Sequence, residues 1–155
     1  MLLNSNIKIH ECVLYNDKKN IWSAFFKVYP NGIHGIEHIE DYIENIYKYF
    51  GFGTWLIRRK EDGVLIGMAG FNYRPGFEEA ELGFVIGCPF WRNGYAYEVC
   101  RHLLYLGKTV FEFEKIQALA DKDNTASICL LEKLGFGYAQ DVMVDGKEYQ
   151  RYLYE

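Results

Sequence analysis

A change in hydrophobic period at Gly51 and Gly53 constrains the fold more than any other feature of this chain. Over residues 35–50, isoleucine, tyrosine and phenylalanine recur at three- and four-residue steps, which gives a helix one apolar stripe. From residue 54, short runs rich in β-branched and aromatic residues are separated by turn-forming residues, which is typical of strands. Because the order along the chain is mixed, with a meander of strands followed by a helix, a strand, a helix and a hairpin, we expect an α+β fold.

Most of the predicted elements lie after this change. Two hairpin signals, EDG at 61–63 and Asp145-Gly146, join neighbouring strands. In chain order the predicted elements are a weak strand at 7–15, helices at 17–29 and 35–50, strands at 54–60, 64–73 and 80–87, a helix from Tyr95 to Phe111, a strand at 115–121, a helix at 124–135, and strands at 136–144 and 147–155. This order predicts a single domain with a mixed, mostly antiparallel, twisted sheet flanked by helices.

The two later helices carry their own boundary and packing signals. Asn124 is a good N-cap and Gly135 a good C′ residue for the helix at 124–135. In the other helix, small and apolar residues recur at helical spacing. We expect the following residues of that helix to face inward: Ala96, Val99, Cys100, Leu103, Leu104, Gly107 and Phe111.

Composition and charge exclude several classes of function. The chain has 155 residues and a net charge of −4, which is too acidic for a general nucleic-acid binder. No apolar run approaches the length that crosses a membrane, and the first 15 residues lack the basic and apolar regions of a signal peptide. We therefore expect a cytoplasmic protein that binds neither nucleic acid nor membranes.

The cysteines and histidines indicate no metal site. The four cysteines form no C-x-x-C pair, and none lies at zinc-ligand spacing from the four scattered histidines. We expect no bound metal, and four reduced thiols: Cys12, Cys88, Cys100 and Cys129.

The stretch WRNGYAYEV at residues 91–99 connects a predicted strand to a predicted helix. Gly94 allows the backbone of this turn to approach a ligand closely, and the N–H groups of about residues 93–97 point out of the helix end. The helix dipole adds about half a positive charge there and Arg92 adds a cation, so the turn suits a pyrophosphate group. An ordinary helix N-terminus with a structural glycine is the alternative interpretation.

With a second motif, this stretch resembles the GNAT superfamily of acetyl-CoA-dependent N-acetyltransferases, and more closely its RimJ/RimL-like branch. The resemblance covers about residues 55–155. The first motif, W-x-x-G-Y-A-x-E, is matched by Trp91, Gly94, Tyr95, Ala96 and Glu98. The second, N-x-x-S-x-x-L-x-E-K-x-G-F, is matched approximately by Asn124, Ser127, Leu130, Glu132 or Lys133, Gly135 and Phe136.

The resemblance implies a GNAT-like fold with splayed central strands, in which residues 54–155 form the cofactor-binding core and residues 1–53 the variable acceptor side. It implies an enzyme that moves an acetyl group from acetyl-CoA to a primary amine, a protein N-terminus or a small amine, by direct attack in a ternary complex. The expected partners are acetyl-CoA and the amine acceptor, and the expected assembly is a monomer or a homodimer. The alternative is a GNAT-like module that binds an acyl-CoA without transferring the acyl group.

The resemblance also assigns cofactor contacts. The strand segment before the turn pairs with the pantetheine arm like an extra strand, and an N–H of Val85 or Ile86 faces the thioester oxygen. Asn124 and Lys133 line the same groove, although an N-cap role for Asn124 and a solvated helix face for Lys133 stay open. The implied cofactor-binding residues are Phe84, Val85, Ile86, Trp91, Arg92, Asn93, Gly94, Tyr95, Ala96, Tyr97, Asn124 and Lys133.

The implied catalytic residues include one departure from the family pattern. Many members carry a tyrosine in the later helix that protonates the leaving thiolate, and the matching residue here is Leu131. That role falls to Ser127, one turn earlier, or is not needed, because a thiolate with a parent pKa near ~8.5 leaves without much help. The general base for the amine is Glu81, on the strand before the cofactor segment, or its rival Asp141, near the start of the closing hairpin.

Overall fold

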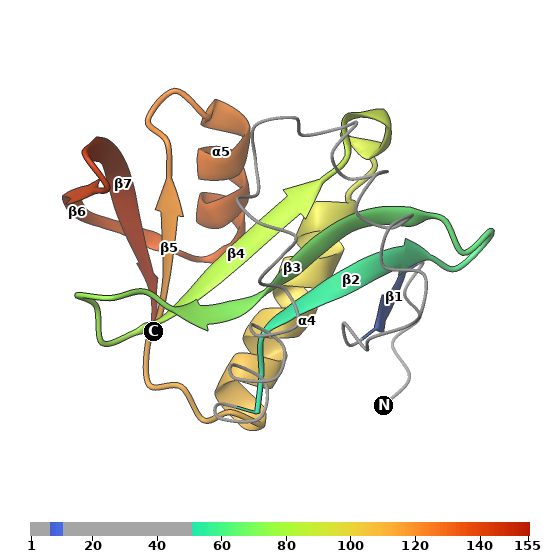
Figure 1. Cartoon of the computed structure of the whole chain (residues 1–155), viewed down its shortest axis with the longest axis horizontal. Coiled ribbons are helices and arrows are strands. Elements are labelled where there is room, and N and C mark those ends of the chain that lie inside the picture. The colour runs from blue at the N-terminus through green and yellow to red at the C-terminus, as the bar shows by residue number, and fades with distance from the viewer. Residues whose placement is uncertain (1–6, 11–50) are drawn as a thin grey trace. The chain divides into compact units, whose positions relative to one another are not determined.

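The computed structural model describes residues 7–10 and 51–155 (Figure 1). The predicted helices at 17–29 and 35–50, and residues 11–15 of the first predicted strand, lie outside the described residues. In chain order the described elements are β1 (Ile7–His10), β2 (Thr54–Arg59), β3 (Leu65–Tyr73), β4 (Ala80–Ile86), the 3₁₀ helix η3 (Cys88–Phe90), α4 (Tyr95–Thr109), β5 (Ile116–Ala120), α5 (Thr125–Leu134), β6 (Gly137–Val144) and β7 (Lys147–Tyr154). Neither of the described α-helices is long and apolar enough to cross a membrane.

These elements belong to two compact units, and strands β3 and β4 each contribute residues to both. The described residues of the first unit are 7–10, 51–70 and 84–95, and those of the second unit are 71–83 and 96–155. The first unit therefore contains the turn of the first sequence motif, and the second contains nearly all of α4 and the whole second motif.

In the first unit the strands follow the order β1-β2-β3-β4. The β1–β2 and β2–β3 pairs are antiparallel, and the turn between β2 and β3 is closed by a hydrogen bond of 2.8 Å from Gly63 N to Arg59 O. Gly67 of β3 has no space for a side chain, because a Cβ there would lie 2.3 Å from the carbonyl oxygen of Val85. The glycine thus allows the backbone of the predicted cofactor segment to approach β3 closely.

In the second unit the strands follow the order β4-β5-β7-β6. β5 is parallel to β4 and antiparallel to β7, which is antiparallel to β6, so the predicted mixed, mostly antiparallel sheet is confirmed. The β4–β5 ladder contains only the pairs Ala80–Ile116 and Glu81–Gln117, although both strands continue beyond these residues. The two strands therefore separate after Glu81 and Gln117, as expected for splayed central strands.

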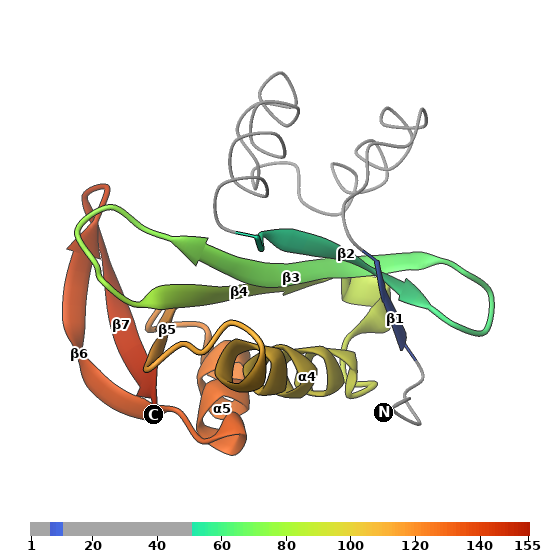
Figure 2. The same ribbon diagram turned by 90° about the horizontal axis from the view of Figure 1, so that it is seen from below.

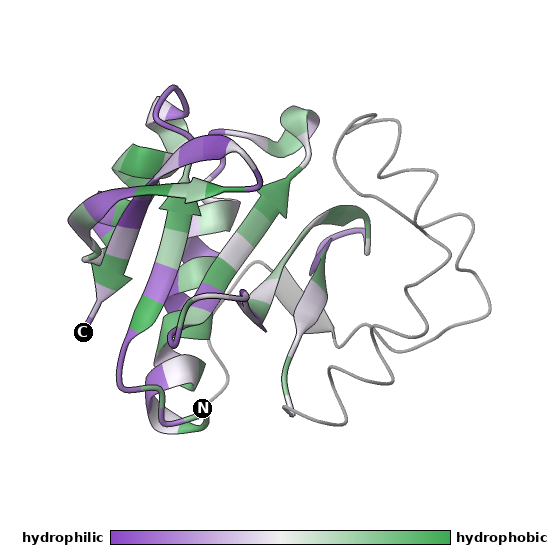
Figure 3. Cartoon of the chain, turned by 60° about the vertical axis from the view of Figure 1, so that its left-hand side comes forward, coloured by the Kyte–Doolittle hydropathy of each residue, from purple (hydrophilic) through white to green (hydrophobic). Residues whose placement is uncertain are grey.

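The two faces of the sheet in the second unit differ in chemistry. Ladder partners point to the same face and successive residues point to opposite faces. Helices α4 and α5 lie on the face that carries Ile116 (Figure 2), because a Cβ at Gly107 would lie 2.8 Å from the Ile116 side chain and the Tyr154 ring lies beside Gly135. β5 is mostly apolar (Figure 3), but its opposite face carries Gln117. We call these two faces the helix face and the Gln117 face.

Helix α4 confirms most of the predicted inward positions and corrects two. Ala96 is only partly buried. Phe111 lies beyond the helix end at Thr109, because the N–H groups of Val110 and Phe111 both donate to the carbonyl oxygen of Leu106 and close the last turn. The Phe111 ring stacks on that of Phe113, with 5.6 Å between ring centroids. The remaining predicted positions are buried in the helix: Val99, Cys100, Leu103, Leu104 and Gly107.

Candidate active site

The predicted pyrophosphate turn is an exposed loop with a left-handed backbone at two residues. Arg92 has a φ of 60° and Gly94 a φ of 81°, and both are exposed. A Cβ placed on Gly94 would meet no atom within 4 Å. Left-handed residues in a turn direct neighbouring N–H groups to one side, which creates a concavity for an anion. The loop leads directly into α4, whose N-terminus adds the positive end of its dipole.

Two side chains of the loop donate hydrogen bonds to backbone carbonyl oxygens in or next to the loop. Trp91 Nε1 donates to the carbonyl oxygen of Ile86 at 2.6 Å, which ties the loop back to the end of β4. Asn93 Nδ2 donates to the carbonyl oxygens of Phe90 at 3.1 Å and Trp91 at 2.9 Å. Because these polar atoms are engaged inside the loop, the side chains of Trp91 and Asn93 shape the loop, and the backbone N–H groups are what the loop presents to a ligand.

Arg59, at the end of β2, contacts both ends of the loop and was not singled out by the sequence analysis. Its guanidinium carbon lies 5.5 Å from the centroid of the Phe90 ring, and its side chain is hydrogen-bonded to Tyr95. Arg59 Nε also donates to Asp62 Oδ1 at 3.0 Å. Hydrogen bonds with Asp62 and Tyr95 raise the pKa of Arg59, and the bond with Arg59 is the main cause that lowers the pKa of Asp62 to about 2. A permanently charged guanidinium therefore lies beside the loop.

In the second unit, α4 and α5 bring together two predicted cofactor residues. Lys133 Nζ lies 4.6 Å from the centroid of the Tyr97 ring, within the range of a cation–π contact. The ammonium group of Lys133, although its residue is exposed, is therefore directed to the first turns of α4. The assignment of Lys133 to the cofactor groove stays a prediction.

The start of α5 confirms the predicted N-cap. Asn124 Oδ1 accepts a hydrogen bond of 3.1 Å from Ser127 N, and the helix ends at Gly135, whose φ is 98°. Leu131, at the position where many family members carry a tyrosine, is buried. Ser127 is only partly buried, so of these two residues it is the one with a side chain that is open to a ligand.

The two candidate bases lie in different surroundings. Glu81 is buried, and both of its carboxylate oxygens are engaged by Arg74, with Nε–Oε2 at 2.6 Å and Nη2–Oε1 at 2.7 Å. This bond is the main cause of a raised pKa of Arg74. A proton transfer to Glu81 would neutralise the carboxylate that Arg74 pairs with, and would therefore weaken this ion pair. Asp141 is exposed, and its Oδ1 accepts a hydrogen bond of 3.1 Å from the Tyr138 hydroxyl.

The register places these two carboxylates on opposite faces of the sheet. Glu81 pairs with Gln117 and lies on the Gln117 face. Asp141 pairs with Gln150, which pairs with Ala120, and Ala120 lies on the same side of β5 as the helix-face residues. Glu81 and Asp141 therefore cannot serve an amine in one and the same position.

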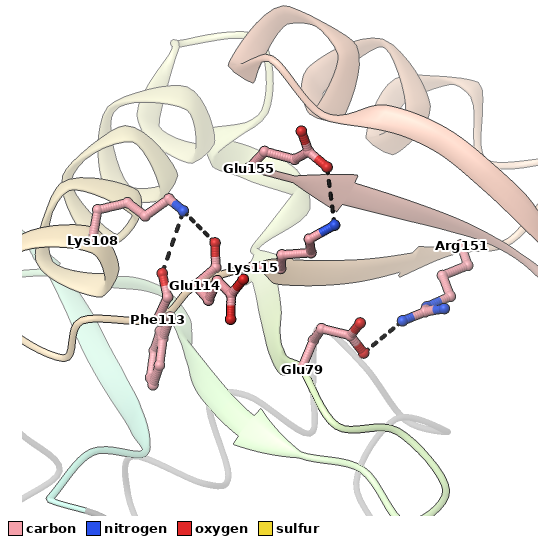
Figure 4. A network of polar contacts seen from close by, with 7 residues as sticks. All are labelled: Glu79, Lys108, Phe113, Glu114, Lys115, Arg151 and Glu155. Carbon is pink, nitrogen blue, oxygen red and sulfur yellow. Dashed lines mark hydrogen bonds and ion pairs between the residues drawn. The ribbon is translucent and has the colours of Figure 1, made fainter.

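The Gln117 face also carries a polar cluster that the sequence analysis did not identify. Arg151 Nη2 donates to Glu79 Oε2 at 2.6 Å (Figure 4), and Arg151 Nε donates to Gln117 Oε1 at 2.8 Å. Among the described residues, Gln117 Nε2 and Glu98 Oε1 are the buried side-chain atoms that have no hydrogen-bond partner. Leaving one buried donor unsatisfied costs about 1–3 kcal/mol, which makes Gln117 Nε2 a candidate for binding a ligand oxygen.

The described cysteines agree with the expectation of reduced thiols. Cys88, Cys100 and Cys129 are free, and burial raises the pKa of the Cys100 thiol well above its ordinary value. Cys12 lies outside the described residues. Within residues 7–10 and 51–155, no group of three or more histidine, cysteine or acidic side chains is arranged to hold a metal ion.

Comparison with known proteins agrees with this geometry. The family model described as acetyltransferase (GNAT) domain matches residues 8–137. The uncharacterized protein YkkB of Bacillus subtilis (strain 168) is 32% identical over 97 residues, which are 61% of this chain and 56% of that protein. The uncharacterized N-acetyltransferase YoaA of the same organism is 33% identical over 112 residues, 68% of this chain and 63% of that protein. The alignments thus span between about half and two thirds of these relatives.

A solved structure shows the same fold. The acetyltransferase from Agrobacterium tumefaciens str. C58 matches with a TM-score of 0.78 at 20% sequence identity. The match covers 96% of this chain and 90% of that one. At this identity the similarity concerns the fold, and it confirms the predicted α+β architecture.

Proposed function

The chain belongs to the GNAT family of acetyltransferases, and we propose that it transfers the acetyl group of acetyl-CoA to a primary amine by direct attack in a ternary complex. The observation that carries this proposal is the exposed left-handed loop at Arg92 and Gly94, at the start of α4. We further propose that the chain belongs to the RimJ/RimL-like branch, which the tryptophan that opens the loop, Trp91, supports. A cytoplasmic location and a monomeric or homodimeric state stay predictions.

The cofactor would be held mainly by backbone groups. The N–H groups of the loop and of the first turn of α4 bind the pyrophosphate, with the dipole of α4 and the charges of Arg59 and Arg92 in support. Lys133, which lies over the Tyr97 ring within the second unit, is a further candidate for cofactor binding in this proposal. The segment Phe84–Ile86 lies past the last pair of the β4–β5 ladder, and it pairs with the pantetheine arm in our proposal.

The chemistry then needs three events: the amine loses a proton, its nitrogen attacks the thioester carbonyl, and the thiolate leaves. A backbone N–H of Val85 or Ile86 stabilises the oxyanion. Glu81 is our first candidate for the base and shares its carboxylate with Arg74 before the reaction. Ser127 is the candidate donor to the thiolate, which also leaves unaided at a modest cost in rate.

A turnover assay tests this proposal directly. Acetyl-CoA is mixed with the full chain and a panel of amines, and free CoA is measured by thiol detection. The proposal predicts release of CoA that depends on at least one amine and formation of an equal amount of acetylated amine. If CoA binds tightly in calorimetry but no amine causes its release, the chain is an acyl-CoA-binding module and the proposed transfer is wrong.

A further inference from the structure

Gln117 occupies the last paired position before β4 and β5 separate. Its side chain is fully buried, and its Oε1 accepts a hydrogen bond from Arg151 Nε at 2.8 Å. This bond defines the orientation of the carboxamide, because only its oxygen can accept from an arginine N–H. The two N–H bonds of Nε2 therefore point elsewhere, and no described residue accepts a hydrogen bond from them. This donor is therefore free to bind an oxygen that a ligand supplies.

The charges around Gln117 are already paired with each other. Arg151 pairs with Glu79 at 2.6 Å, and Arg74 pairs with Glu81 at 2.6 Å. Each cation is matched by one carboxylate, so these two pairs contribute no net charge that would attract an anionic ligand. The partner that suits Gln117 Nε2 is therefore a neutral oxygen, such as the carbonyl oxygen of an amide.

Space for a ligand lies on the same face of the neighbouring strand. Gly83 follows Glu81 by two residues, so both point to the Gln117 face. A Cβ placed on Gly83 would meet no atom within 4 Å, and Gly83 is partly exposed. In the proposed function the thioester end of acetyl-CoA lies where β4 and β5 separate. An amine that attacks the thioester from this face passes over Gly83, on the face of the sheet that also carries Gln117.

We propose that Gln117 is a specificity-determining residue that donates a hydrogen bond to a neutral carbonyl oxygen of the acceptor, close to its reactive amine. This inference rests on the proposed acetyl transfer and names the acceptor class within it. Amines that carry an amide carbonyl satisfy the buried donor, whereas alkylamines and polyamines offer it no oxygen. The pantetheine arm also contains carbonyl oxygens, but Lys133 and Tyr97 belong to helices on the opposite face of the sheet from Gln117.

The test compares two amines of similar size in two matched variants. Gln117→Glu keeps an oxygen for Arg151, removes the amide donor and adds a negative charge. Gln140→Glu makes the same change at an exposed ladder partner of Arg151. We measure kcat/KM with glycinamide and with isobutylamine, and we express each variant relative to wild type so that the different nucleophilicities of the amines cancel. CoA affinity is measured by calorimetry.

Gln117→Glu should lower kcat/KM for glycinamide by roughly tenfold to a hundredfold, with less than about a twofold change for isobutylamine and for CoA affinity. Gln140→Glu should change neither amine selectively. If Gln117→Glu melts below the assay temperature, Gln117→Met, which keeps the volume without the donor, should show the same selective loss.

Equal losses with both amines, as a bound water or a structural role would give, overturn the inference. So does a loss confined to CoA affinity, which would assign the carbonyl to the cofactor. If wild type acetylates no amine, the proposed function fails as well.

Discussion

The exposed loop at residues 91–94 and the buried polar cluster around Gln117 are built on opposite principles. The loop presents backbone N–H groups in water, and its side chains Trp91 and Asn93 are used to shape it. The cluster consists of buried and half-buried side chains, whose charges are paired with each other. The loop should therefore be sensitive to changes of backbone conformation, and the cluster to changes of single side-chain atoms.

The largest effect is expected in the cluster, at Glu81. If Glu81 is the base, Glu81→Gln should lower kcat by about a hundredfold or more at neutral pH while CoA still binds. The loss should shrink as the pH rises toward ~10, because an alkylamine then loses its proton unaided. The measurement is a pH profile of kcat for wild type, Glu81→Gln and Asp141→Asn.

The two carboxylates have different predicted outcomes because they lie on opposite faces of the sheet. Asp141→Asn should stay near wild-type activity. The reverse result, with Asp141→Asn inactive and Glu81→Gln active, would make Asp141 the base. A loss in Glu81→Gln that does not change with pH would instead show that the pair with Arg74 is structural.

The loop should be most sensitive at Gly94. Gly94→Val adds a branched side chain at a φ of 81°, where such a residue is strained, and at the surface where the pyrophosphate is proposed to lie. CoA affinity should fall on the order of a hundredfold in calorimetry. Gly146→Val is the matched control, because Gly146 has a φ of 78° and open space around its Cβ position. A folded Gly94→Val with wild-type CoA affinity contradicts the pyrophosphate assignment.

Arg59 should have a smaller effect, because it supports the loop from outside. Arg59→Met removes the contacts with Phe90 and Tyr95 and should weaken CoA binding by about fivefold to tenfold. The neighbouring Arg58 donates to the carbonyl oxygen of Gly63 instead, so Arg58→Met should leave CoA affinity unchanged. Binding of pantetheine, which lacks the pyrophosphate, should be equal in both variants. A similar loss of affinity for CoA and for pantetheine in Arg59→Met would show that Arg59 does not act on the pyrophosphate.

The smallest effect concerns the pH dependence of the Arg59–Asp62 pair. The pKa of Asp62 is lowered from 3.8 to about 2, so the pair stabilises the folded chain above about pH 4 and this contribution is lost as the pH falls toward 2. Because both side chains are exposed, the gain is small. Thermal unfolding of wild type and Asp62→Asn should differ by a few °C at most at pH 5, and the difference should shrink by pH 2. A constant difference over this interval would mean that the charge of Asp62 plays no part.

The sequence predicted the described strands and helices to within a few residues, and their signals are local. The N-cap at Asn124 and the left-handed turn at Gly135 depend on contacts within one helix, and both are confirmed. The helix end at Thr109 was placed two residues too late, because Phe111 is apolar at helical spacing but packs from the following segment on Phe113. The spacing of apolar residues predicts which side chains are buried, but it does not predict the residue at which the helix ends.

The loop could be located from the sequence because a glycine between a strand and a helix defines its backbone within a few residues. The partners of the polar side chains could not be predicted from the sequence, because the two residues of most pairs are far apart in the chain. Arg74 and Glu81 meet across a turn, Gln117 meets Arg151 over 34 residues, and Glu79 meets Arg151 over 72 residues. These contacts depend on the strand order β4-β5-β7 and on the register between the strands. A slip of one residue would move every side chain of a strand to the opposite face of the sheet. Local patterns therefore determined the elements and the position of the glycine turn at residues 91–94. The tertiary structure decided the pairing of Glu81, the face of Asp141 and the buried donor of Gln117 that no described residue satisfies.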